Sequence, residues 1–283
     1  MIYQQRTPAI ARSIAGFWGK SLDDKQWYTA KTTGENTAEV RIYDIIGWPF
    51  VEASEFARDL DAITADTITV KINSPGGDVF DGIAIYNMLV KKSARIITEV
   101  EGLAASMASI ISLAADPADR KISASAYYMI HNASTFAWGD YRVMEKSRVL
   151  LKETIGARII DIYAQASGKS PAEMQKIMDD ESWYTGKSAV DAGFLGAVID
   201  QKPAATGAFN LDIFNNAPAT PEQPLTKREI EQKLTQDAGF RRSTARLLLK
   251  GGYGALTTQD AGEPNANPQT LSSLNELIKA IGG

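Results

Sequence analysis

Residues 71–134 contain three motifs: INSPGGDVFDG (72–82), EGLAASMAS (101–109) and MIHNAS (129–134). The first motif is a Gly-rich turn that leaves backbone N–H groups free, and the second places Ser106 among small residues. The third contains His131, the only histidine in the chain. Each motif closes a predicted β-strand (67–72, 95–102 and 121–131). Three consecutive strand–turn units therefore each place a candidate site residue at the same strand end.

The flanking sequence alternates strands and helices in the same way. AEVRIYDII (38–46) has the apolar–polar alternation of a strand, and helical spacing follows at 54–63, with Ser54 as the expected N-cap, and at 79–91. The pattern also predicts a small-residue helix at 105–115 and a long amphipathic helix at 141–167. A helix starting at Ser170–Pro171, a helix at 186–192 and the strand LGAVID complete the series. Such alternation predicts a layered α/β domain with right-handed crossovers.

Changes in composition predict the domain boundaries. Residues 1–33 lack clear periodicity and are interpreted as an N-terminal arm, either loosely ordered or docked on a neighbouring subunit. The α/β domain is expected to span 34–202, followed by a linker rich in Ala, Thr, Asn and Pro at 203–224. A basic helical hairpin is predicted at 225–256, and a tail with a terminal amphipathic helix at 257–283. The hairpin either binds a protein partner or has a solvated basic face without one.

Composition excludes several classes of site. The 283 residues include no cysteine, which excludes disulfides, thiolate zinc sites and a cysteine nucleophile, and a single histidine excludes a multi-histidine metal centre. A net charge of -4 gives no support for a nucleic-acid or anionic-membrane partner. The longest apolar run, 102–115, is too short to span a bilayer. The first thirty residues lack a secretory core, so we expect a cytoplasmic protein.

The motifs match the requirements of acyl transfer. A serine hydroxyl needs a base within hydrogen-bond reach and N–H donors aimed at the developing oxyanion. Ser106 lies where a strand turns into a helix, so the N–H of Met107 is a candidate donor, and Gly77 in the Gly-Gly turn is a second. Each feature also has a purely structural interpretation: a common turn, a core histidine, or a serine that packs within a helix.

INSPGG, the serine of AASM and the histidine of MIH, in this order, resemble the Clp protease proteolytic subunit (ClpP) family. The resemblance covers roughly residues 38–201 and is closer to the ClpP-related head-maturation proteases of tailed phages and prophages. It implies a ClpP/crotonase-type fold of repeated strand–strand–helix units, here with a small α-helical C-terminal appendage. It also implies a serine endopeptidase that assembles into homo-oligomeric rings and cleaves phage scaffold or capsid proteins. Such an enzyme would act in the bacterial host cytoplasm or within a phage prohead, and the partner of the basic hairpin would be a capsid or scaffold protein. Ser106 would be the nucleophile and His131 the base, with Gly77 and Met107 as backbone oxyanion donors.

The acidic member departs from the family pattern. At the position of the family's aspartate the chain has Glu181, in DDESWYTGKSAVDAG, and the neighbouring Asp180 and Asp179 are substitutes. Glutamate can orient an imidazole in hydrolase triads. The purely structural interpretation is that all three carboxylates form a solvated helix end. A weakened Ser–His dyad that depends on ring assembly is a third alternative.

Substrate and subunit contacts follow from the same resemblance. A substrate is expected to add as a β-strand beside Gly76, Gly77, Asp78 and Val79. The expected oligomer contact is an apolar stripe on the long helix, and core burial explains part of this stripe equally well. The stripe consists of Val143, Val149, Leu150, Ile155, Ile159, Ile160 and Tyr163. Acyl transfer of this kind needs no cofactor and no metal.

Four alternatives stay open. A signal-peptide-peptidase-type protease shares the Ser-Pro-Gly-Gly turn but uses lysine as its base. An enoyl-CoA hydratase-like enzyme would not need a serine–histidine pair. A ring or capsid scaffold would retain only a vestigial site. A general peptidase would depend on an ATPase partner, for which the sequence carries no clear docking signal.

Overall fold

The computed structural model describes residues 6–18, 20, 22, 28–34, 36–200, 209–211, 213–218, 235 and 242. The chain divides into two compact units, Met1–Ala217 and Pro218–Gly283. The predicted hairpin at 225–256 and tail at 257–283 lie outside the described residues, apart from positions 235 and 242.

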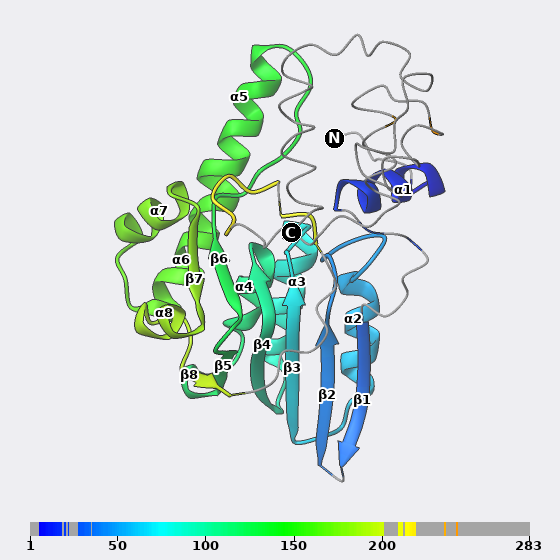
Figure 1. Ribbon diagram of the computed structural model, residues 1–283, viewed down its shortest axis with the longest axis vertical. Helices are drawn as coiled ribbons and strands as arrows, with labels where there is room; N and C mark the ends of the chain where they lie inside the picture. The colour runs from blue at the N-terminus through cyan, green and yellow to red at the C-terminus, as the bar shows by residue number, and fades with distance from the viewer. Residues whose placement is uncertain are drawn as a thin grey trace, which may run out of the picture. The chain divides into compact units, whose positions relative to one another are not determined.

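A mostly parallel sheet forms the centre of this unit, as the strand–helix alternation predicts (Figure 1). Its order is β1-β2-β3-β4-β5-β8, in which β1 is antiparallel to β2 and the remaining neighbours are parallel. The apolar side chains of β3 (Ile68, Val70 and Ile72) are buried, because they lie on the face of the sheet that packs against the helices. The strands are β1 (Tyr28–Gly34), β2 (Thr37–Ile42), β3 (Thr67–Ser74), β4 (Arg95–Ala105), β5 (Arg120–Ser123), β6 (Tyr127–Ile130), β7 (Ser182–Thr185) and β8 (Ala197–Ile199).

The long strand β4 changes partner along its length. Thr98, Glu99 and Val100 pair with β5, whereas the last three residues of β4 pair with β6. The prediction of one strand over 121–131 is therefore wrong. The chain must leave β5 and turn before it can pair again, and Ala126 N donates to Ser123 O within that turn. The antiparallel strand β7 then adds to β6.

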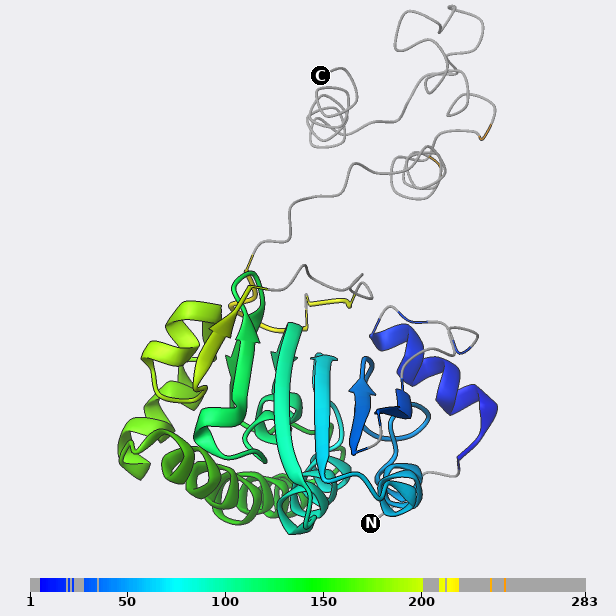
Figure 2. The same cartoon turned by 90° about the horizontal axis from the view of Figure 1, so that it is seen from below.

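Helices cover one face of the sheet (Figure 2). The described helical segments are α1 (Pro8–Phe17), α2 (Ala53–Ala62), α3 (Val79–Lys91), α4 (Met107–Ser112), the 3-10 turn η1 (Pro117–Asp119), α5 (Tyr141–Val149), the π-helical turn η2 (Leu150–Gly156), α6 (Ala157–Ser167), α7 (Pro171–Asp179) and α8 (Gly186–Asp191). The main core lies between this layer and the sheet and includes Ile68, Val70, Ile85 and Leu89. Among the described residues, no helix is long and apolar enough to cross a membrane.

The caps of α2 and α3 differ from each other. Asp78 caps α3 by accepting from the N–H groups of Phe80 and Asp81. Ser54 does not cap α2: this helix begins at Ala53, and its N-cap Glu52 makes no side-chain cap bond. Instead Ala53 N donates to the Asp81 carboxylate at 2.8 Å. A tertiary acceptor on α3 thus replaces the local cap that the sequence predicts.

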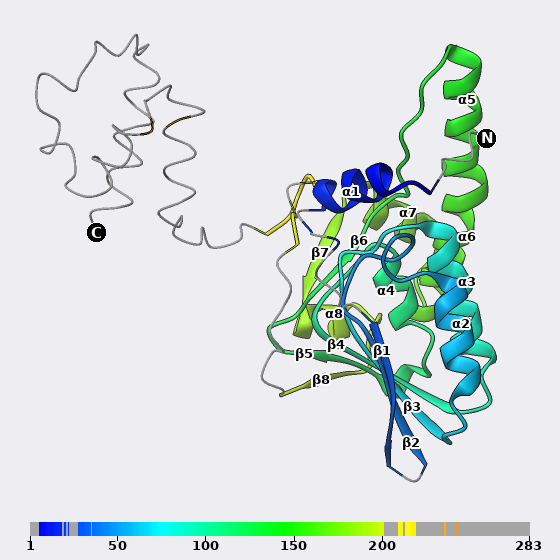
Figure 3. The ribbon, with the colours of Figure 1, turned by 90° about the vertical axis from the view of Figure 1, so that its right-hand side faces the viewer.

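The predicted long helix is one helical stretch formed by α5, η2 and α6 (Figure 3). Its α5 part buries no side chain and projects beyond the sheet, whereas α6 packs on α4 and α7. Ile155, Ile159 and Tyr163 belong to the core, so the interpretation of these three as an oligomer contact is wrong. Val143 and Leu150 are exposed. The apolar stripe therefore divides between core and surface.

Residues 6–18 contain a helix that the sequence analysis did not predict. Thr7 accepts from Ile10 N and Pro8 begins α1, which is a standard helix start. The Thr7–Pro8 pair is a local signal that the sequence itself carries. Part of the predicted linker, residues 209–211 and 213–217, also packs on the fold. Both segments lie at the carboxyl ends of the central strands (Figure 1).

Candidate active site

Ser106 occupies a sharp turn between β4 and α4. Its φ of 53° and ψ of -124° are unusual for a residue other than glycine, and strain of this kind concentrates at functional positions. The turn is fixed from outside, because Ser106 N donates to Met129 O of β6 at 3.1 Å. The hydroxyl consequently lies at the start of a helix, at the carboxyl edge of the sheet.

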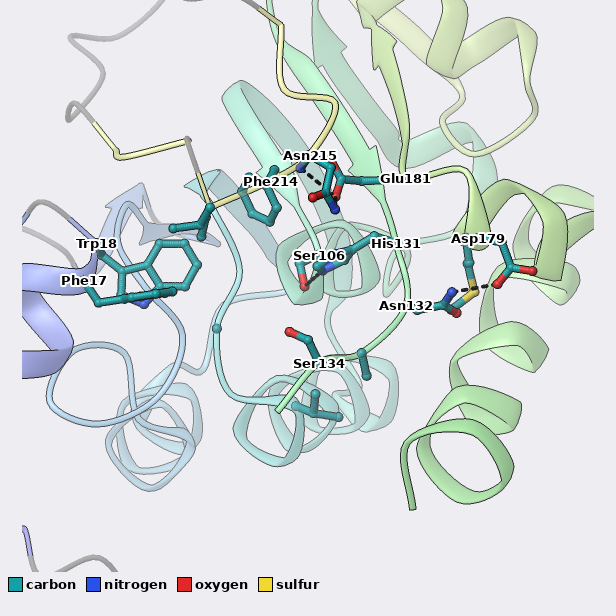
Figure 4. A pocket seen from close by; sticks show the side chains of 15 residues that line it. Phe17, Trp18, Ser106, His131, Asn132, Ser134, Asp179, Glu181, Phe214 and Asn215 are labelled. Carbon is teal, nitrogen blue, oxygen red and sulfur yellow. Dashed lines mark hydrogen bonds between the residues drawn. The ribbon is translucent and has the colours of Figure 1, made fainter. Parts of the chain in front are cut away.

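His131 follows β6 directly and faces this serine (Figure 4). Its Nε2 lies 2.9 Å from Ser106 Oγ, within hydrogen-bond distance. The two side chains meet because the end of β4 pairs with β6, which brings two strand ends side by side. This is the geometry that a nucleophile and its general base require.

The two candidate oxyanion donors lie beside the serine. Met107 is the first residue of α4, so its N–H has no intrahelical acceptor. A Cβ on Gly76 would lie 2.6 Å from Ser106 Cβ and 3.0 Å from Met107 N, which shows how closely the Gly-Gly turn approaches the serine. Within the described residues, no backbone carbonyl accepts from the N–H of Gly77 or of Met107. Both amides are available to bind a developing negative charge.

The predicted substrate strand is already paired along one edge. Ile46 N donates to Gly76 O, and Asp78 N donates to Ile46 O, both at 2.8 Å. Because alternate backbone groups of an extended chain face opposite edges, Gly77 is left to face the other side. Gly77 and Val79 line the cavity around Ser106, whereas the Asp78 carboxylate is engaged in capping α3.

A network of buried hydroxyl groups holds the backbone of the turn at Ser106. The sequence analysis did not predict this network. Ser109 Oγ donates to Ser106 O at 2.5 Å and lies 2.6 Å from the Tyr163 hydroxyl. Tyr128 donates to Ser109 O at 2.9 Å. Burial raises the pKa of Tyr163 well above its ordinary value of 10.0, so this phenol stays neutral. These bonds hold the carbonyl of Ser106 and thereby the direction of its side chain.

Glu181 is buried near the histidine but is bonded elsewhere. Its Oε1 accepts from Asn216 N at 2.7 Å and from Trp183 Nε1 at 3.4 Å. Its Oε2 accepts from the N and Nδ2 of Asn215 at 3.0 and 3.1 Å. In the described part of the chain, no hydrogen bond joins Glu181 to His131. Glu181 also has a positive φ of 46°, which it shares only with Ser106 among the described non-glycine residues.

Among the described residues, neither substitute for Glu181 forms a hydrogen bond with the imidazole. The Asp179 carboxylate accepts from Asn132 and Gln175, each at 2.7 Å. The carbonyl of Asp180 accepts from Asn216 Nδ2 at 2.9 Å. Of the three carboxylates, only Glu181 acts electrostatically on His131. The structure therefore favours Glu181 as the candidate acid, although its role stays a prediction.

The electrostatics suit a histidine that acts as a base. Burial lowers the pKa of His131 below its ordinary value of 6.5, and the negative charge of Glu181 opposes this only in part. Burial alone would raise the pKa of Glu181, but hydrogen bonds from Asn216, Asn215 and Trp183 hold it below 4.5. At neutral pH the imidazole is therefore neutral and the carboxylate is charged.

A cavity of about 390 Å³ surrounds the serine and histidine (Figure 4). Besides Ser106 and His131, its walls include Phe17 and Trp18 from the end of α1 and Phe214 from the C-terminal segment. The sequence analysis missed these aromatic residues, because only tertiary packing brings them to the site. No lysine lines this cavity among the described residues, which weighs against a lysine base. The described residues also contain no cluster of His, Asp or Glu suited to a metal.

Comparison with known families points to the same family that the three motifs resemble. The family model described as Clp protease matches residues 59–202, about half of the chain. The chain belongs to the Clp protease family. The matched range includes the candidate residues Gly77, Ser106, His131 and Glu181, but neither α1 nor residues 209–217.

Individual relatives agree. The ATP-dependent Clp protease proteolytic subunit 1 of Protochlamydia amoebophila is 39% identical over 132 residues, which are 46% of this chain and 63% of the relative. The protein of the same name from Chlamydia muridarum is 36% identical over 135 residues, 47% of this chain and 69% of the relative. The chain thus spans about two thirds of the length of these curated relatives. Among solved structures, a point mutant of ClpP1 from Listeria monocytogenes matches with a TM-score of 0.51 and 26% identity, covering 58% of this chain and 92% of that one.

The pKa of His131 gives a pH prediction for this member of the Clp protease family. Because a base must be neutral, kcat/KM should fall as the pH drops through the His131 pKa, at a pH below 6.5. Glu181→Gln removes the negative charge that raises the pKa of His131. The fall of kcat/KM at acidic pH should therefore occur at a still lower pH. The measurement is the pH profile of kcat/KM on a short peptide. Asp179→Asn is the matched control and should leave the acidic side of the pH profile unchanged. If Asp179→Asn shifts the profile and Glu181→Gln does not, Asp179 is the acid of the triad.

Proposed function

We propose that the protein is a serine endopeptidase of ClpP type. Ser106 attacks the peptide carbonyl while His131 removes its proton and then returns it to the leaving amine. The N–H groups of Gly77 and Met107 bind the oxyanion, and Glu181 stabilises the imidazolium. Water then attacks the acyl-enzyme carbonyl while His131 removes its proton. The carboxylic acid product leaves, and the proton returns to Ser106 Oγ. The observation that carries this proposal is the 2.9 Å contact between Ser106 Oγ and His131 Nε2 beside two available amides.

Active-site labelling tests this function directly. A fluorophosphonate probe should form an adduct at Ser106, found by peptide mass spectrometry, because only an activated serine reacts. Ser106→Ala should abolish both the adduct and the cleavage of unfolded casein. Ser134→Ala is the matched control: this serine lines the same cavity, and its loss should leave labelling intact. A protein that is never labelled would favour a hydratase-like enzyme or an inactive scaffold.

The finer proposal is a head-maturation protease of a phage or prophage that cleaves scaffold or capsid proteins. The resemblance of the three motifs to that group supports it. The second candidate is an ATPase-assisted peptidase, which the names of the chlamydial relatives favour. Incubation with folded phage scaffold and capsid proteins, beside Ser106→Ala, separates the two. An enzyme that cuts only short or unfolded peptides would support the second.

A homo-oligomeric ring is part of the same proposal. The segment that leads into α5 exposes Phe136 and Trp138, at 93% and 96% of their surface, and α5 buries nothing. Exposed apolar groups of this size are typical of a subunit contact. Sedimentation should show a ring that Phe136→Ser with Trp138→Ser dissociates. A monomer at every concentration would contradict it.

A further inference from the structure

The segment that follows β8 returns to the active site and closes one side of it. We call residues 209–211 and 213–217 the strap. Phe214 is its anchor: it is 7% exposed and lies in an apolar cluster with Leu103 and Met129. Its ring centroid is 5.5 Å from that of His131. The strap thus contacts the candidate base itself (Figure 4).

The strap also donates hydrogen bonds to the carboxylate of Glu181, the candidate acid. An ionised carboxylate has about four lone-pair sites. At Glu181 three of the four bonds come from the strap: Asn216 N at 2.7 Å, Asn215 N at 3.0 Å and Asn215 Nδ2 at 3.1 Å. Trp183 Nε1 supplies the fourth. No acceptor site is left for an imidazole N–H.

His131 is therefore without its orienting acid. Among the described residues, the hydrogen bonding of its ring is confined to Ser106. Both Glu181 and His131 line the same cavity, and the carboxylate acts on the imidazole through space. A carboxylate in this position normally fixes the imidazole tautomer and stabilises its charged form. Here that partner is present but occupied.

We propose that the strap is an autoinhibitory element: it holds Glu181 away from His131, and its displacement converts a Ser–His pair into a Ser–His–Glu triad. The inference rests on the proposed serine peptidase function and adds a means of regulating it.

The position and the structure of the strap would allow a substrate to displace it from the cavity. Ile213, Phe214 and Asn215 line the same cavity as Ser106, so an extended substrate entering the cavity competes with them. The strap has no regular secondary structure, and its Asn215 and Asn216 are exposed. It lies outside the residues matched by the Clp protease model, so it is not part of the matched family domain. An apolar side chain of the substrate can replace Phe214 against Trp18 and Trp183.

Release of the strap should accelerate the labelling of Ser106. Phe214→Ala removes the anchor, and Asn215→Asp places a negative charge against the Glu181 carboxylate. If the strap is closed roughly 90–99% of the time, either change should raise the second-order rate with a fluorophosphonate by about 10- to 100-fold. Asn210→Asp is the matched control: it adds the same charge to the strap, at a residue whose backbone N donates to Trp18 O. It should label at the wild-type rate.

The role of Glu181 in this gain is tested by a double variant. Phe214→Ala with Glu181→Gln should label no faster than Glu181→Gln alone, because the freed residue can no longer act as the acid. The sole histidine gives an independent readout: in ¹³C-histidine-labelled protein, Phe214→Ala should raise the His131 pKa, and the double variant should raise it less.

The outcomes separate the two proposals. Faster labelling in both strap variants, lost with Glu181→Gln, supports the autoinhibitory strap. Equal or slower labelling in folded Phe214→Ala and Asn215→Asp would overturn it and make the strap a supporting part of the working site. If Ser106 is labelled in no protein, wild type included, the peptidase function falls, and the strap inference with it.

Discussion

His131→Ala should lower kcat/KM for a short peptide by about 10⁵- to 10⁶-fold, the loss typical when a member of a Ser–His pair is removed. The reason is geometric. Ser106 Oγ has His131 Nε2 2.9 Å away, and the chain has no other histidine to take its place. In free-energy terms the loss is about 7–8 kcal/mol of transition-state stabilisation. Initial rates with a fluorogenic peptide, with the fold checked by circular dichroism, give the measurement.

Added imidazole is a control for this variant. The substitution leaves a space beside a cavity of about 390 Å³, large enough for free imidazole to enter. Imidazole should therefore restore part of the activity of His131→Ala and none of that of Ser106→Ala. Full activity of His131→Ala without imidazole would show that another group is the base, and would revive the lysine-dependent class of protease.

The meeting of Ser106 and His131 could be predicted from the sequence because its signals are local. Gly77, Ser106 and His131 each follow a strand of one sheet, and the carboxyl ends of parallel strands meet at one edge. A serine at a strand-to-helix turn also predicts its own oxyanion donor, the N–H of Met107. The layered α/β fold follows from the same alternation, and the structure confirms it. The catalytic roles themselves stay predictions.

The parts that the sequence analysis missed depend on tertiary contacts. The split of the predicted strand 121–131 follows from the change of partner along β4, which no local pattern records. Phe214 lies in a stretch whose composition indicates a linker, yet it packs on His131. The bonding of Glu181 to Asn215 and Asn216 joins positions that are distant in the sequence. By contrast, the helix start at Thr7–Pro8 was a local signal and could have been found.

The strap and the family match lead to a common view of this site. Residues 59–202, which the Clp protease model matches, contain the candidate nucleophile, base, acid and oxyanion donors. The aromatic walls from α1 and the strap lie outside them. Family membership therefore accounts for the chemistry proposed here. In the proposed regulation, access to that chemistry is controlled by the strap, which lies outside the matched residues.

Gly77→Ala should reduce kcat by about 100- to 1,000-fold, the loss expected when one oxyanion donor is displaced. Gly77 has a φ of 145°, a conformation that favours glycine. A Cβ at this position would lie 2.1 Å from the carbonyl oxygen of Ile46, a backbone atom that cannot rotate away. The turn must therefore shift, and its N–H moves with it. KM should change little, because the lost interaction forms mainly in the transition state.

Gly16→Ala is the matched control for this substitution. A Cβ on Gly16 meets nothing within 4 Å, and this residue lies inside α1, where alanine is favoured over glycine by about 0.5–1 kcal/mol. Its melting temperature should stay level or rise, with activity unchanged. Gly77→Ala should unfold more easily, by roughly 1–3 kcal/mol, since an alanine with positive φ is strained. A folded Gly77→Ala enzyme with wild-type kcat would remove the Gly77 amide from the oxyanion hole and leave Met107 as its donor.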